Sequence, residues 1–125
     1  MWLPESRLRV WLYRRPSDMR KSFDGLAALV KGELCEQPTS GDLYAFLNRR
    51  RTLMKVLYFE RGGYCVWSKR LEQGQFQVAF AGAHKALLEP ATLKLIIDGI
   101  DTTRLHRFKR YRLPETHRHL IEYPV

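Results

Sequence analysis

LNRRRTLMKVLYFERGGYCVWSKRLEQGQF, residues Leu47–Phe76, contains two strand-like runs on either side of a glycine pair. The runs, residues 53–59 and 64–69, are rich in aromatic and β-branched side chains, which favour strands. Gly62 and Gly63 predict a two-residue turn between them, because a type I′ turn needs positive φ at both central positions. We therefore expect an antiparallel β-hairpin, and this hairpin decides the fold class.

Pairing outward from that turn assigns the hairpin side chains to two faces. The more apolar face carries Met54, Val56, Tyr58, Cys65 and Trp67. We expect this face to pack against a helix, with Tyr58 opposite Trp67. The other face alternates aromatic side chains with bases and places Lys55 opposite Arg70. Like charges placed in this way repel, so water or a polyanion has to screen them.

The flanking segments predict further strands and two helices. Strands are expected at residues 9–15, 43–47 and 76–80. Residues 18–35 carry apolar side chains at the helix period, in a stripe of Phe23, Leu26, Ala27, Val30 and Leu34. Residues 89–99 predict a short second helix, with a proline near its start and a glycine near its end.

This order of elements is typical of an α+β protein. We predict a single α+β domain over residues 1–103, an antiparallel β-meander with a helix packed on one face and a short C-terminal helix. Residues 104–125 are rich in bases and predict a basic C-terminal tail. That tail is either an electrostatic arm or a plain disordered end, and its histidines are expected at the surface.

Charge is the most informative feature of the composition. The chain has 125 residues, with 22 Lys and Arg against 13 Asp and Glu, a net charge of +9. With 45% hydrophobic residues, it has the composition of an ordinary globular protein. The excess of positive charge predicts attraction to polyanions, to nucleic acid first and to an anionic membrane surface second.

Several functional classes find no support in the sequence. Cys35 and Cys65 lack the spacing of a disulfide framework or a metal site. The start, MWLPESRLRVW, has no apolar core of a signal peptide, and no apolar run approaches the ~20 residues of a membrane span. We expect a cytoplasmic protein without membrane contact. Because no carboxylate pair, Cys/His pair or glycine-rich phosphate loop converges, we also expect no catalytic residues, metal or cofactor.

Lysine and arginine residues cluster around the predicted hairpin. Pairing brings the arginine triplet after residue 48 to the same end as bases of both strands, and the candidate nucleic-acid-binding residues are Arg49, Arg50, Arg51, Lys55, Arg61, Lys69 and Arg70. Arginine forks match phosphate oxygens, and the release of counterions favours such contacts without reading sequence. The alternative is a solvated sheet edge whose positive charge prevents aggregation.

Three motifs carry a family resemblance. They are SDMRKSFDGLAALV from Ser17, GDLYAFLNRRRTLMKVLYFERGGYCVWSKRLEQGQF from Gly41 and LLEPATLKLIIDGID from Leu87. In this order they resemble the accessory TnpB proteins, products of the second open reading frame, of the sixty-six family of bacterial insertion sequences. Ser22 departs from the pattern, which often has glycine there, and the tail after Asp101 carries no resemblance.

The resemblance implies a role in transposition, in which a separate and larger transposase supplies the catalytic carboxylates. Two hypotheses follow. The chain is a DNA-binding accessory protein that uses a basic sheet edge to help the transposase engage the element ends. Alternatively, it is a protein–protein adaptor that docks on the transposase without touching DNA. The sequence leaves the oligomeric state open.

Overall fold

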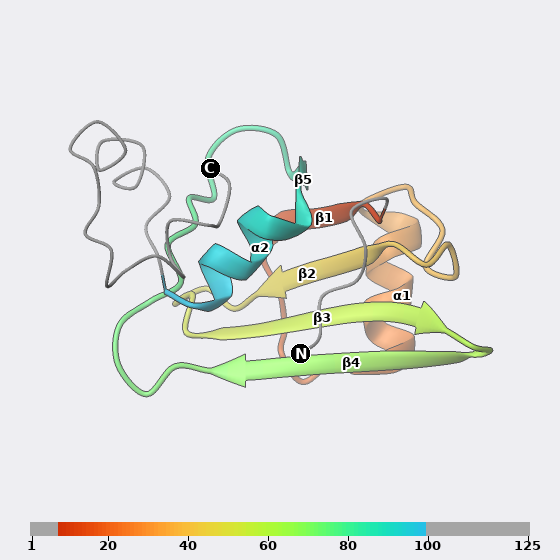
Figure 1. Cartoon of the computed structure of the whole chain (residues 1–125), viewed down its shortest axis with the longest axis horizontal. Helices are drawn as coiled ribbons and strands as arrows, with labels where there is room; N and C mark the ends of the chain where they lie inside the picture. The colour runs from red at the N-terminus through yellow and green to blue at the C-terminus, as the bar shows by residue number, and fades with distance from the viewer. Residues whose placement is uncertain (1–7, 100–125) are drawn as a thin grey trace, which may run out of the picture.

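The computed structural model describes residues 8–99, which form one mixed β-sheet and two helices (Figure 1). Its elements are β1 (Val10–Pro16), α1 (Phe23–Gly32), β2 (Leu43–Leu47), β3 (Leu53–Glu60), β4 (Gly63–Arg70), β5 (Lys85–Leu88) and α2 (Pro90–Ile97). The strand order is β4-β3-β2-β1-β5. The predicted α+β class is confirmed, while the predicted tail at residues 104–125 lies outside the described residues.

The sheet is not antiparallel throughout. The predicted meander is present in β2, β3 and β4, which pair antiparallel in sequence order. β1, however, pairs parallel with β2, and β5 joins the outer side of β1 antiparallel. Parallel neighbours need a crossover connection, and α1 provides it between β1 and β2. The expectation of a purely antiparallel meander is therefore corrected at β1.

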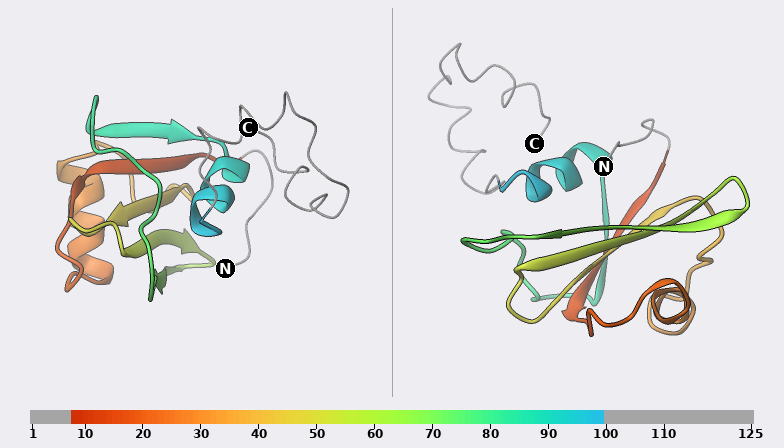
Figure 2. Two further views of the ribbon diagram at one scale, coloured as in Figure 1. Left: turned by 90° about the vertical axis from the view of Figure 1, so that its left-hand side faces the viewer. Right: turned by 90° about the horizontal axis from the view of Figure 1, so that it is seen from below.

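Helices cover both faces of the sheet, α1 on one and α2 on the other (Figure 2). The α1 face buries Tyr13, Leu26, Ala27, Val30, Leu34, Tyr44, Phe46 and Leu57. The α2 face buries Val10, Leu12, Leu43, Ala45, Leu47, Met54, Val56, Phe76, Val78, Leu93, Ile96 and Ile97. The central strand β2 is buried along its whole length because both its faces are covered.

The expected packing of the hairpin on the first helix is wrong. Met54 and Val56, with the half-buried Tyr58 and Trp67, pack on the α2 side. Instead, α1 covers the opposite face, where Leu57 is fully buried. The alternating pattern could not decide between the faces, because β3 carries large apolar side chains on both of them.

The hairpin turn lies one residue earlier than predicted. Its central residues are Arg61 and Gly62, with φ of 52° and 80°, and Glu60 pairs with Gly63. Each cross-strand pair is therefore shifted by two residues, although every side chain keeps its predicted face. Phe59 now lies opposite Tyr64, and their rings meet edge to face at 5.1 Å.

The shift also replaces the pairs expected further along the hairpin. Lys55 faces Ser68 and Arg70 faces Leu53, so the predicted repulsion between Lys55 and Arg70 does not arise. Tyr58 faces Cys65 rather than Trp67.

Other boundaries also differ from those expected. The first helix is shorter than residues 18–35, and Phe23 at its start is 47% exposed rather than part of the core stripe. Residues 76–80 form no strand, although Phe76 and Val78 are buried against the α2 face. The fifth strand at residues 85–88 was not predicted.

The packing of α1 predicts a contrast between two substitutions in the same helix. Leu26→Ala removes a fully buried side chain and should lower the free energy of unfolding by about 3 kcal/mol. Phe23→Ala should lower it by less than about 1 kcal/mol, because that ring is half in water. Urea unfolding of both variants measures the difference. Equal losses would contradict the position of α1.

Candidate nucleic-acid interface

Two loops meet at one end of the sheet because β1 and β2 are parallel. The carboxyl ends of both strands lie at the same edge, so the loop at residues 17–22 and the loop at residues 48–52 leave the sheet side by side. The backbone N–H of Ser17 donates to the carbonyl of Leu47 at 2.8 Å. The end of β4 lies there too, since the N–H of Leu71 donates to the carbonyl of Thr52 at 2.7 Å.

Five cations at this end form a group that we call the basic end. Arg20, Arg49, Arg50 and Arg70 are exposed, and Lys21 is half-buried. The stem of Lys21 lies against the backbone of α1, at the position of Gly25. The basic end thus draws on two loops and a strand terminus that are far apart in the sequence.

Asp18 shapes the first loop. Its carboxylate accepts the backbone N–H of Arg20 at 2.9 Å and the guanidinium of the same residue at 2.8–3.2 Å. These hydrogen bonds from Arg20 hold the pKa of the Asp18 carboxyl well below its usual range. The Arg20 side chain is 91% exposed, so the loop orients this guanidinium while leaving it open to solvent.

Asn48 shapes the second loop. Its side-chain oxygen accepts the backbone N–H groups of Thr52 at 2.8 Å and Leu53 at 3.1 Å, which closes the turn into β3. Arg49 and Arg50 lie at the exposed tip of this turn. Neither arginine side chain has a hydrogen-bond or ion-pair partner among residues 8–99, so both are available to a ligand.

Three of the predicted binding residues have internal partners instead. Arg51 has a φ of 58°, donates to the carbonyl of Val78 at 2.7 Å and lies over the ring of Phe80 at 5.8 Å. Its Nε is buried and has no hydrogen-bond partner in the part of the chain that the structure describes. The expectation that all three arginines of the triplet lie in an exposed loop is therefore wrong for Arg51.

Lys55 and Lys69 also bind backbone carbonyls, on opposite faces of the sheet. Lys55 Nζ donates to the carbonyl of Lys21 at 2.8 Å and fastens the first loop to β3. Lys69 Nζ donates to the carbonyl of Ile97 at 3.0 Å, at the end of α2, where the helix dipole favours a cation. The predicted single cluster is thus divided between structural and exposed bases.

The two remaining predicted residues occupy different ends of the hairpin. Arg70 belongs to the basic end and forms an ion pair with Glu72 at 3.0 Å, in which both side chains are more than 70% exposed. Arg61 lies in the turn at the other end of the hairpin and is exposed. Arg20 and Lys21 were missed in the sequence, because only the parallel pairing of β1 and β2 brings their loop to this end.

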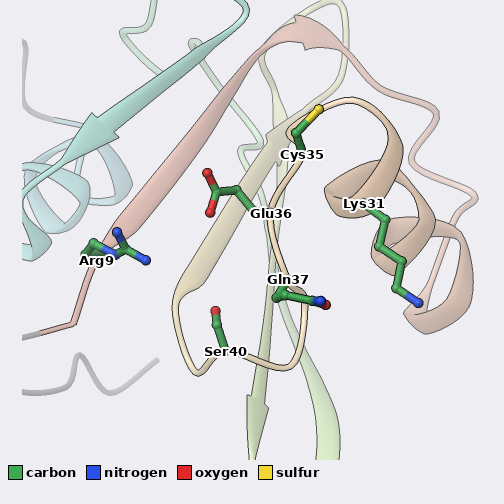
Figure 3. Close-up of a pocket in the computed structure, with 6 residues that line it drawn as sticks. All are labelled: Arg9, Lys31, Cys35, Glu36, Gln37 and Ser40. Atoms are coloured by element: carbon green, nitrogen blue, oxygen red, sulfur yellow. The ribbon is translucent and has the colours of Figure 1, made fainter.

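An open hollow of about 810 Å³ lies beyond the end of α1 (Figure 3). It is lined by Arg9, Lys31, Cys35, Glu36, Gln37 and Ser40, with Arg9 and Lys31 on opposite sides. Two of its three charged side chains already have partners, since Glu36 pairs with Lys85 at 2.8 Å and Arg9 with the buried Asp42 at 3.1 Å. No group of three metal-ligating side chains is found among residues 8–99.

Comparison with known proteins identifies the family. A family model described as IS66 Orf2-like protein matches residues 8–107, and with it all of the described sheet and helices. The chain belongs to the IS66 Orf2-like family. This family is an accessory family of IS66 transposition and is not a known catalytic family. The resemblance drawn from the three sequence motifs is thereby confirmed.

Two curated relatives of this IS66 Orf2-like protein come from Sinorhizobium fredii (strain NBRC 101917 / NGR234), and both are described only as uncharacterized proteins. Protein y4hO is 35% identical over 94 residues, which cover 75% of this chain and 82% of y4hO. Protein y4jC is 30% identical over 104 residues, which cover 83% of this chain and 89% of y4jC. No solved structure gives a significant match. Within residues 8–99, neither helix has the length and hydrophobicity to cross a bilayer.

The free energy of unfolding should distinguish the structural Arg51 from the exposed Arg49 of the same triplet. Arg51→Ala removes a charged hydrogen bond and an aromatic contact, and should lower the free energy of unfolding by about 2 kcal/mol. Arg49→Ala removes an exposed side chain and should change it by less than about 0.5 kcal/mol. Chemical denaturation of both variants provides the test. An Arg51→Ala variant with unchanged stability would show that the internal contacts of Arg51 do not stabilise the fold.

The Asp18 carboxyl should titrate abnormally. Because Arg20 lowers its pKa, the ion pair persists as the pH falls through the ordinary carboxyl range and is lost only at more acidic pH. NMR titration of the side-chain carboxyl carbon should give a midpoint below the ordinary range of an aspartate side chain. In Arg20→Gln the midpoint should return toward the usual value. Identical midpoints in the two proteins would mean that Arg20 does not shape the loop.

Proposed function

We propose that this IS66 Orf2-like protein assists transposition by binding DNA phosphates through the basic end. The observation that carries the proposal is that the loop with Arg20 and Lys21 and the loop with Arg49 and Arg50 leave the sheet at the same edge, where the N–H of Ser17 donates to the carbonyl of Leu47. Arg49 and Arg50 have no anionic partner among residues 8–99. Cations gathered at one end of a sheet repel one another, and a bound polyanion relieves that repulsion.

The acids near the basic end do not cancel it. Asp18 and Glu72 pair with Arg20 and Arg70, but both pairs lie at the surface. Exposed ion pairs are weak because water and salt screen them, so each arginine can exchange its carboxylate for a phosphate. The arginine fork can bind a phosphate in two places at once, as Arg20 binds the Asp18 carboxylate here.

Contacts of this kind position DNA but do not read its sequence. Affinity should therefore vary little between duplexes of equal length and should fall steeply with salt, by about 0.9 in log–log slope for each phosphate contact. In this proposal the transposase supplies both the catalysis and the choice of element ends, and the accessory chain adds sequence-independent affinity.

Removal of the Arg49 and Arg50 side chains should weaken DNA binding. The double variant Arg49→Ala/Arg50→Ala should bind a duplex more weakly than the wild type, with a salt slope smaller by about 2. The matched control is Lys31→Ala/Arg61→Asn, which removes the same net charge from exposed positions away from the basic end; asparagine tolerates the positive φ of Arg61. Fluorescence anisotropy over a salt series measures both, and circular dichroism checks folding.

Three outcomes would overturn the proposal. The first is equal loss of affinity in the test and control variants, which would show only a general effect of net charge. The second is an unchanged slope in Arg49→Ala/Arg50→Ala. The third is a variant that keeps its DNA affinity but no longer binds purified transposase, which would support the adaptor hypothesis instead.

A further inference from the structure

The longest free edge of the sheet is β4. Within residues 8–99 it has a strand neighbour on one side only, and β5, at the other edge, is half its length. Helices α1 and α2 lie on the two faces, so neither covers this edge (Figure 2). An uncovered edge strand presents unpaired backbone groups to other chains.

The turn determines which backbone groups of β4 point outward. Glu60 and Gly63 flank a two-residue turn and so form a hydrogen-bonded pair. The bond from Leu71 to Thr52 continues the same alternation at the other end. It follows that the N–H and C=O groups of Tyr64, Val66, Ser68 and Arg70 point away from β3.

We propose that β4 pairs antiparallel with β4 of a second copy, joining two sheets across a two-fold axis at Trp67. This register matches outward residues with outward residues, Tyr64 with Arg70 and Val66 with Ser68, which is the pattern of a hydrogen-bonded ladder. On the other face, Cys65 lies opposite Lys69, and the two Trp67 side chains become neighbours. Such a closed, self-complementary interface is the commonest kind in homodimers.

Charge does not oppose this pairing. No like charges lie opposite each other in the register, and Arg70 meets an aromatic ring rather than a base. The ammonium of Lys69 is already bound by the carbonyl of Ile97 in its own chain. The two Arg70 residues lie at opposite ends of the paired strands, roughly 20 Å apart along the strand axis. Their repulsion is screened at physiological salt, where the Debye length is about 8 Å.

Edges that avoid pairing usually carry proline, a bulge or an obstructing charge. β4 has no proline, and its pairing with β3 is regular from Gly63 to Arg70. A second copy suits this edge better than an unrelated strand. In a single two-fold symmetric register, the outward N–H and C=O groups are paired and no like charges lie opposite each other. The proposal does not depend on DNA binding, since Arg70 is the one residue of the basic end that lies in the interface and Arg49 and Arg50 are outside it.

The test uses the full chain and the outward N–H of exposed Ser68. Ser68→Pro removes this N–H, which has no partner strand in the monomer, whereas Ser68→Thr keeps it. Sedimentation velocity over a concentration series should give dimers for the wild type and Ser68→Thr, and a halved mass for Ser68→Pro. A monomeric wild type at all concentrations, or a Ser68→Pro that remains dimeric, would overturn the proposal.

Hydrogen exchange on the wild type covers the case in which Ser68→Pro does not fold. The outward amides of Val66 and Ser68 should exchange slowly in concentrated protein and rapidly on dilution. Exchange that is fast at every concentration would overturn the proposal. So would protection that appears only when transposase is added, because the edge would then bind a different protein.

Discussion

The parallel pairing of β1 and β2 is the constraint on which the rest of the structure depends. β2 is the central strand and is buried along its length, and its register with β1, Val10 against Leu43 and Leu12 against Ala45, places β1 inside the sheet, between β2 and β5. A parallel neighbour requires a crossover, so α1 must lie on one face. The same pairing places the carboxyl ends of both strands at one edge, where ligands commonly bind in open sheets.

The lysine and arginine side chains of this protein have two different roles. Arg51, Lys55 and Lys69 donate to backbone carbonyls and join loops or helices to the sheet. Arg49 and Arg50, next in sequence to Arg51, are exposed at the tip of the same turn. A high net charge therefore overstates the number of groups available to DNA. Only the structure distinguishes the structural from the exposed lysines and arginines, because the distinction depends on whether a backbone carbonyl lies within reach of the side chain.

Much of the fold was predictable from the sequence because it rests on local signals. The glycine pair and the strand runs predicted the hairpin, apolar periodicity predicted α1, and the proline and glycine at its ends predicted α2. The exact turn was not predictable, since Gly62–Gly63 and Arg61–Gly62 are both compatible with positive φ at a turn. The direction of β1 was not predictable either, because alternation of side chains carries no information about parallel or antiparallel pairing.

The candidate site was predictable only in part for the same reason. Arg49 and Arg50 were found as a charge run in a turn, and Arg70 through the hairpin pairing. Arg20 and Lys21 join them only through the long-range contact between β1 and β2, which no local pattern reveals.

The central claim is that two loops, distant in sequence, form one phosphate-binding surface. NMR titration of isotope-labelled protein with a short DNA duplex tests it most directly. We predict that the backbone amides of residues 18–22 and 48–51 shift together, with one midpoint, while those of Lys31 and Arg61 stay in place. Shifts confined to one loop, or centred on the hairpin turn at Arg61, would contradict the account.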